Sequence, residues 1–241
     1  MTTSFLKKAP FLFSMLLAFL VLQSCNPFGV RATGDDQTLS FDETDFNGLE
    51  LCTSGEVEVR IDSVFKIEVT CEETAMPYVR TEVNNGILKV YFSRTIYDLD
   101  NMKIVVSAPS WDYFDVSGSG NIEILDAIEG QKLQLEVSGS GSVRAMEAHF
   151  DKADLEVSGS GDLRLAGSAD VLDCDISGSG KIKCFDFLVN TAHVNVSGGG
   201  DVQVNVLEVL DAKISGSGSI VYKGSPEVNA QISGSGSVKK F

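Results

Sequence analysis

Ser117-Gly118-Ser119-Gly120 is the first of seven related tetrapeptides that divide the second half of this chain into similar units. Five further copies are identical, and the copy at Ser197 has glycine in place of the second serine. The copies open at positions 117, 138, 158, 177, 197, 215 and 233, so the period is 18 to 21 residues. A period near twenty is typical of a stacked array in which each unit leans on its neighbours.

Two positions around each tetrapeptide hold only aliphatic residues. The residue before the first serine is always valine or isoleucine, and the fifth residue after it is always valine, isoleucine or leucine. Columns this uniform indicate ladders of like side chains on successive strands. Each unit is therefore expected to contain a strand, a tetrapeptide corner, a second strand and a variable connection such as 147–152.

The leading fold prediction is an all-β solenoid, a right-handed parallel β-helix with coils of about 20 residues. If side chains keep alternating through the corner, both glycines point inward and both serines outward. A bend without an inner Cβ lets the backbone approach the rung below. The alternative treats each tetrapeptide as the loop of an antiparallel hairpin, giving a meander, prism or barrel.

Residues 41–110 are predicted to form an antiparallel or mixed β region, continuous with the solenoid predicted over 111–241. Apolar and polar residues alternate there with a period of two, which is typical of half-buried strands. Asn84-Asn85-Gly86 separates two such runs and predicts a hairpin, because Asn-Gly tolerates positive φ.

The N-terminus carries the pattern of an export signal. Lys7 and Lys8 precede an apolar run that is too short to span a bilayer, and the run ends before Ser24-Cys25. This junction resembles the bacterial lipoprotein cleavage site, so residues 1–24 are predicted to be the signal and Cys25 the lipidated first residue. Residues 25–40 are predicted to be a flexible tether. The protein would then be anchored to a membrane, most plausibly the outer membrane, without crossing it.

The formal charge of −15 argues against nucleic acid as a partner, since binding a polyanion requires a basic face. No Gly-Lys-Ser/Thr sequence or complete Gly-rich nucleotide motif is present, and no cofactor is predicted. Neither His149 nor His193 has the partners of a triad or metal cluster, so no catalytic or metal-binding residue is assigned.

Four cysteines remain after Cys25, and an exported protein with an even number can form disulfides. Cys52 and Cys71 lie in neighbouring predicted strands and could bridge if these strands pair. Cys174 and Cys184 occupy positions that are aliphatic in other units. They are therefore interpreted first as small buried apolar residues.

An outward column of carboxylates is the candidate site in this sequence. It lies two residues before successive tetrapeptides and consists of Asp115, Glu136, Glu156 and Asp175. A solvated face with ion pairs is the simplest interpretation. Divalent cation binding and carbohydrate-active catalysis by these acids are the alternatives. A basic column six residues after the serines, including Arg144 and Lys183, could offset the acids if it lies near them.

The whole pattern resembles the putative auto-transporter adhesin, head GIN domain family. The resemblance rests on Phe46-Asn47-Gly48-Leu49-Glu50-Leu51, on the strands through Val69, on the Asn85-Gly86 hairpin and on the repeated Val-Ser-Gly-Ser-Gly. It covers about 46–241 and implies an exported, mostly lipid-anchored β-rich protein of the kind common in Bacteroidetes. No catalytic residue comes with the family.

The functional prediction is a non-enzymatic, lipid-anchored cell-envelope protein. Its β-solenoid surface would act as an adhesin or structural module and bind a protein or glycan. The alternative is a carbohydrate-active enzyme that uses the outward carboxylates.

Overall fold

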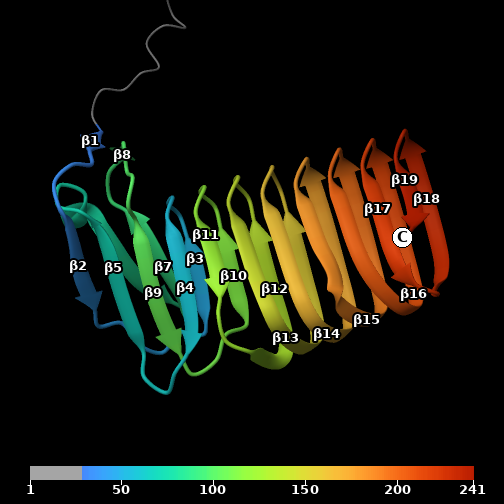
Figure 1. The fold of residues 1–241 in the computed structure, drawn as a ribbon, viewed down its shortest axis with the longest axis horizontal. Coiled ribbons are helices and arrows are strands. Elements are labelled where there is room, and N and C mark those ends of the chain that lie inside the picture. Colours follow the sequence, from blue (N-terminus) through green and yellow to red (C-terminus); the bar gives the residue numbers. More distant parts are fainter. Residues whose placement is uncertain (1–28) are drawn as a thin grey trace, which may run out of the picture.

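Residues 29–241 are described in the computed structural model, where parallel coils stack along one long axis (Figure 1). The predicted signal peptide and Cys25 lie outside the described residues. Within 29–241 the fold is all-β apart from a single 3-10 turn, η1 (Met76–Tyr78). No helix in this part of the chain is long and apolar enough to cross a lipid bilayer.

In chain order the strands are β1 (Val30–Arg31), β2 (Asp36–Phe41), β3 (Gly48–Leu51), β4 (Glu56–Ile61), β5 (Lys66–Glu72), β6 (Val79–Asn84), β7 (Ile87–Phe92), β8 (Ile96–Tyr97), β9 (Lys103–Ala108), β10 (Tyr113–Val116), β11 (Asn121–Ile124), β12 (Ile128–Val137), β13 (Ser142–Val157), β14 (Asp162–Gly178), β15 (Lys181–Gly198), β16 (Asp201–Gly216), β17 (Ser219–Gly224), β18 (Glu227–Gly234) and β19 (Ser237–Lys240). The longest strands are β13 to β16, with 16 to 18 residues each, whereas the others have ten residues or fewer.

Each coil has two walls that meet at the tetrapeptide corner. The first wall contains the strand segments before the corners, in β10, β12 to β16 and β18. The second wall contains the segments after them, in β11, β13 to β17 and β19. All pairings between these coils are parallel, with Val116 beside Val137 and Ile122 beside Val143. The predicted β-solenoid is therefore confirmed, and the antiparallel hairpin alternative is wrong.

The two aliphatic columns form the core of the solenoid. The column before the corner is buried from Val116 to Ile214, and the column after it is buried from Ile122 to Ile220. Burying one such side chain contributes about 1.5–3 kcal/mol. Because each side chain is covered by its equivalents on adjacent rungs, the rungs stabilise one another.

The variable connections are themselves strands. Residues 147–152, predicted as a connection, lie inside β13, which runs without a break from the second wall around to the next first wall. The register between β13 and β14 shifts between Ala145 and Ala148. Such a β-bulge bends the strand and absorbs the difference in unit length.

The corner serines are exposed as predicted, and both glycines of a corner face the backbone of the neighbouring rung. A Cβ on the first glycine, Gly139, would overlap the carbonyl oxygen of Gly118, and a Cβ on the second, Gly141, would overlap that of Gly120. Gly141 is buried and also faces the aliphatic ladder, because its Cβ would lie 2.6 Å from Val116 Cγ1. A side chain at either glycine would therefore collide with the neighbouring rung.

The stack continues below β10 with strands from the N-terminal region. β3 and β4 pair in parallel with β10 and β11, so Cys52-Thr53-Ser54-Gly55 occupies the place of a tetrapeptide corner. β7 and β9 form the next rung, in parallel with β3 and β4. The order of rungs in space therefore differs from their order in the chain.

Antiparallel strands cover the N-terminal end of the stack. β6 pairs with β7 through the predicted hairpin, in which Asn85 and Gly86 have φ values of 52° and 79°. β5 pairs with β9, and β2 is the edge strand beyond β5. Trp111 is buried against Phe46 and Phe114, beside the β3 and β10 rungs, and donates from Nε1 to the carbonyl oxygen of Arg60 at 2.8 Å.

The tether prediction over 25–40 is wrong for much of that range. β1 pairs in parallel with β8, and β2 lies antiparallel to β5. β2 shows no apolar periodicity because it is an edge strand with almost every side chain exposed. Main-chain pairing holds it, together with a 2.8 Å hydrogen bond between the hydroxyls of Thr38 and Thr70.

The four cysteines of the described chain are free. Cys174 and Cys184 are fully buried among the aliphatic ladders, which confirms their interpretation as small apolar residues. Cys52 sits at the corner between β3 and β4, whereas Cys71 lies in β5, and these strands do not pair with each other.

We predict that Gly139→Ala lowers the free energy of unfolding by about 2 kcal/mol, because the added methyl group overlaps the carbonyl of Gly118. Gly199→Ala is the matched control, since the nearest atom to its Cβ would be Ser179 Oγ at 3.8 Å. Urea denaturation followed by circular dichroism measures both. Equal destabilisation by the two variants would contradict this account of the corner.

Candidate binding surface on the first wall

The four predicted carboxylates form one continuous column on the outer face of the first wall. Asp115 lies beside Glu136, Glu136 beside Glu156 and Glu156 beside Asp175, each on the next rung. A fifth member that was not predicted, Glu50, pairs with Asp115 from β3. The alternation of Leu, Glu and Leu at 49–51 matches Phe, Asp and Val at 114–116 and could have identified it.

At each end of this carboxylate column, the terminal carboxylate has a polar partner. Lys89 Nζ lies 2.7 Å from Glu50 Oε1 at one end, and Asn195 Nδ2 donates to Asp175 Oδ1 at 2.9 Å at the other. Burial raises the pKa of Glu50, but hydrogen bonds from Lys89 and Cys52 outweigh it and lower that pKa below its usual value.

Asp115 has the most perturbed carboxyl group of the column. Burial, followed by the nearby charges of Glu136 and Glu50, raises its pKa to about 6. Burial and the same acidic surroundings also raise the pKa of Tyr113, whose hydroxyl lies 3.4 Å from Glu136 Oε2. Adjacent carboxylates with little solvent between them favour the protonated form.

The basic column does not offset these acids. Arg144 and Lys183 belong to the second wall, beyond the corner, and pair with acids there. Lys183 Nζ lies 2.6 Å from Asp162 Oδ2, and Arg144 Nε lies 3.9 Å from Glu123 Oε1. The corner turns the chain between the two columns, so they face different directions.

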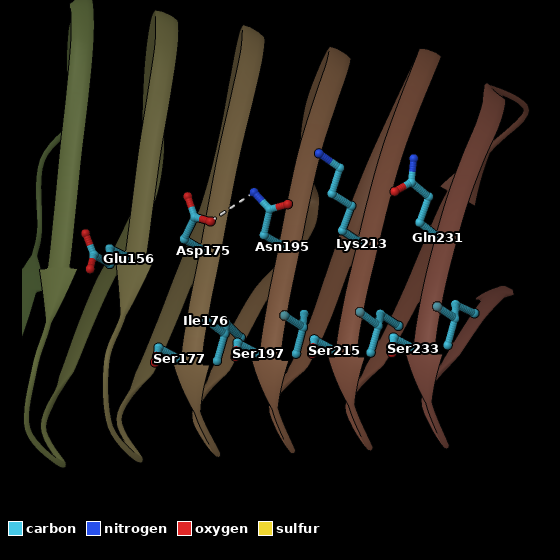
Figure 2. A pocket seen from close by; sticks show the side chains of 13 residues that line it. Glu156, Asp175, Ile176, Ser177, Asn195, Ser197, Lys213, Ser215, Gln231 and Ser233 are labelled. Carbon is cyan, nitrogen blue, oxygen red and sulfur yellow. Dashed lines mark hydrogen bonds between the residues drawn. The ribbon is translucent and has the colours of Figure 1, made fainter.

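A groove of about 480 Å³ follows the first wall toward its C-terminal end. Figure 2 shows one row of polar side chains that crosses successive rungs and a second row formed by the corner serines. The first row contains Glu156, Asp175, Asn195, Lys213 and Gln231; the second contains Ser177, Ser197, Ser215 and Ser233. The aliphatic residues that line the groove beside the serines are Ile176, Val196 and Ile214, which are each 2% exposed, and Ile232, which is 47% exposed.

The groove changes chemical character along its length. Carboxylates line one end, Asn195 stands in the middle, and Lys213 and Gln231 follow toward β18. Neighbouring members of the row are in register, with Asn195 beside both Asp175 and Lys213. The groove thus offers acceptors, amides and a cation in a fixed order along the stack axis.

The geometry of a carbohydrate-active site is not evident around the carboxylate column. A second hollow of about 240 Å³ gathers Glu136, Asp154 and Asp173 with neighbouring acids, but no aromatic residue lines it or the groove. Lys152 Nζ bridges Asp154 and Asp173 at 2.9 and 2.7 Å, so part of this charge is already paired. Within residues 29–241, no group of His, Cys, Asp and Glu is arranged to hold a metal ion.

The stacked coils and outward groove define a β-solenoid protein with a surface suited to binding. Residues 45–226 match the family described as putative auto-transporter adhesin, head GIN domain, and this chain belongs to that family. The resemblance in the sequence is therefore confirmed. Membership supports an adhesin-like binding role in an exported or cell-surface protein. Among curated proteins none matches the chain.

Solved structures share this fold. A putative adhesin from Bacteroides fragilis has a TM-score of 0.83 and 23% identity, covering 88% of this chain and 100% of its own. A putative adhesin from Parabacteroides distasonis has a TM-score of 0.74 and 23% identity, with coverages of 88% and 100%. A putative lipid binding protein from the same species has a TM-score of 0.73 and 25% identity, with coverages of 88% and 99%. None of these comparisons supports the enzyme alternative.

We predict that Asp115→Asn stabilises the protein at neutral pH. The folded pKa of about 6 exceeds the unfolded value of about 3.9, so ionised Asp115 destabilises the fold above pH 6. After discounting for solvent screening, the gain is about 1 kcal/mol at pH 7.5, and it falls toward zero as the pH drops to about 4. Urea unfolding across this pH range measures the gain.

Asp151→Asn, at an exposed residue of β13, controls for the loss of one negative charge. If the stability gained by Asp115→Asn does not decrease on acidification, repulsion among the ionised carboxylates of the column is not its cause.

Proposed function

We propose that this protein is a non-enzymatic, lipid-anchored cell-envelope protein that binds an extended protein or glycan segment along the first-wall groove. The observation that carries the proposal is the continuity of the groove across successive rungs. Rungs in a parallel stack are about 4.8 Å apart, so the groove presents polar groups at a regular interval. A regular row suits a chain-like ligand better than a compact small molecule.

The composition of the groove supports hydrogen-bonded recognition with a direction. Asp175, Asn195 and Lys213 provide an acceptor, an amide and a cation in sequence. A few placed polar groups beside apolar surface are typical of ligand sites, in which the polar groups set orientation. Because the row is acidic at one end and basic further along, a ligand with charges in the opposite order would bind in one orientation.

The proposed anchor is the lipid on Cys25, close to the start of the described chain. Lys7 and Lys8, the apolar run and Ser24-Cys25 support it. Stable attachment generally requires more than one acyl chain, which lipoprotein modification of both the thiol and the amine would supply. Val30–Arg31 is paired with β8, so the tether would be short.

We predict that Asn195→Ala combined with Lys213→Ala weakens binding of the extended ligand at least tenfold, about 1.4 kcal/mol, because both side chains line the groove. The first measurement is an array of glycans and matrix proteins, followed by titration of any hit. Lys181→Ala with Asp201→Ala, on the second wall at similar rungs, is the matched control. A hit that binds the groove variant as tightly as the wild type would refute the groove assignment.

We also predict that Cys25→Ser moves the protein from the membrane fraction to the soluble fraction, because no thiol remains to carry lipid. Fractionation of the expressing cells with immunoblotting measures the distribution. Cys52→Ser, a substitution in the corner between β3 and β4, should leave membrane retention unchanged. Retention of the Cys25→Ser protein would exclude lipid attachment at this residue.

A further inference from the structure

Within residues 29–241, the rung formed by β18 and β19 is covered on one side only. In this range β18 pairs only with β16, and β19 pairs only with β17. This rung lies at the end of the stack opposite β2 (Figure 1). Ile232 is 47% exposed, whereas Ile214, its equivalent on the preceding rung, is 2% exposed.

Main-chain groups of this rung repeat the arrangement that joins the interior rungs. The carbonyl oxygen of Gly216 accepts hydrogen bonds from the amides of Ser235 and Gly236, at 2.9 and 3.1 Å. Gly234 stands in register with Gly216 and has a similar φ of 123°. The outer edge of β18 and β19 therefore has the backbone shape on which another strand can add.

Basic residues surround this edge in a protein of net charge −15. Lys239 and Lys240 are exposed on β19, and Lys223 lies on β17. The ammonium of Lys223 lies 4.5 Å from the Phe185 ring centroid and 5.2 Å from that of Phe241, which is 79% exposed. Glu227 is the acidic residue within β18 and β19.

We propose that the outer edge of β18 and β19 binds an extended segment of a partner protein by β-strand addition, and that this segment alternates aliphatic and acidic residues. In β-strand addition, main-chain hydrogen bonds provide affinity and side-chain positions provide selectivity. Val238 belongs to the inner aliphatic column and Lys239 to the outer basic one. An added strand would place aliphatic residues over Val238 and acidic residues beside Lys239.

Charge favours such a partner over a second copy in tip-to-tip contact. Two copies facing each other at this edge would bring Lys223, Lys239 and Lys240 of both into proximity, and like charges across an interface cost affinity. The opposite end of the stack has its own edge strand, β2, so head-to-tail contact with a second copy is one outcome that the test distinguishes. Lys223, Lys239 and Lys240 lie on β17 and β19 of the second wall, whereas Asn195 and Lys213 in the middle of the groove lie on the first wall, so the two surfaces are separate.

The experiment titrates a fluorescent peptide of sequence Asp-Val-Glu-Val-Asp-Val into the full chain and follows anisotropy. This peptide is an acidic version of residues 201–206, the segment that pairs in parallel with β17 inside the solenoid. We expect saturable binding that weakens at least tenfold in Lys239→Glu/Lys240→Glu and at higher salt. A peptide with proline at its central valine, which lacks one amide donor, is expected to bind more weakly.

Two results would overturn the proposal. One is that the peptide does not bind, or that its affinity changes neither in Lys239→Glu/Lys240→Glu nor when proline replaces its central valine. The other is concentration-dependent self-association through this edge, detected by sedimentation velocity and lost in Lys239→Glu/Lys240→Glu, which would assign the edge to a second copy.

The groove variant Asn195→Ala/Lys213→Ala should bind the peptide normally. The two surfaces are tested separately. If the groove does not bind the extended ligand, the peptide can still bind the β18–β19 edge. If the edge does not bind the peptide, the extended ligand can still bind the groove.

Discussion

The close approach of backbones at the Ser-Gly-Ser-Gly corners is the constraint on which this structure depends. A carbonyl oxygen of one rung lies where a Cβ of the next would stand, as Gly118 does beneath Gly139. Only a residue without a side chain permits this contact, and the amide of Ser140 then reaches the Gly118 oxygen at 3.2 Å. Glycine and serine are interchangeable at Gly199, because the nearest atom to an added Cβ would be Ser179 Oγ at 3.8 Å. Stacking the corners sets the register of every strand attached to them.

One register serves both stability and the outer surface. It places valines and isoleucines in buried ladders, and it also places Glu50, Asp115, Glu136, Glu156 and Asp175 side by side. The inward ladders contribute apolar burial, whereas the outward acids repel one another and raise the pKa of Asp115. Paired groups at the ends, Lys89 and Asn195, limit that cost. The polar row of the groove is the same column continued onto rungs where the acids are replaced.

The two ends of the stack are built differently. At one end, the antiparallel strands β5 and β6 pair with β9 and β7, the outermost parallel rung. At the other end, Ile232 and the edge of β18 face solvent beside lysines. The N-terminal end of the described chain carries the antiparallel strands, and the exposed edge of β18 lies far from it, as expected if the proposed anchored protein meets its partners away from the membrane. Adhesin-like family membership is consistent with this polarity.

The repeat, the ladders, the exposed serines, the Asn85-Gly86 hairpin and the four-acid column are predictable from the sequence alone, because periodicity records which face each side chain takes. The stacking of β3 and β4 beneath β10, which adds Glu50 to the column, and the pairing of β2 with β5 became visible only in the folded protein. Pairing between distant strands depends on which main-chain edges remain free, and local patterns carry no record of that. The groove likewise forms only when the row of polar side chains and the row of corner serines are aligned across successive rungs. Each column could be read from the sequence, whereas the hollow between them exists only after stacking.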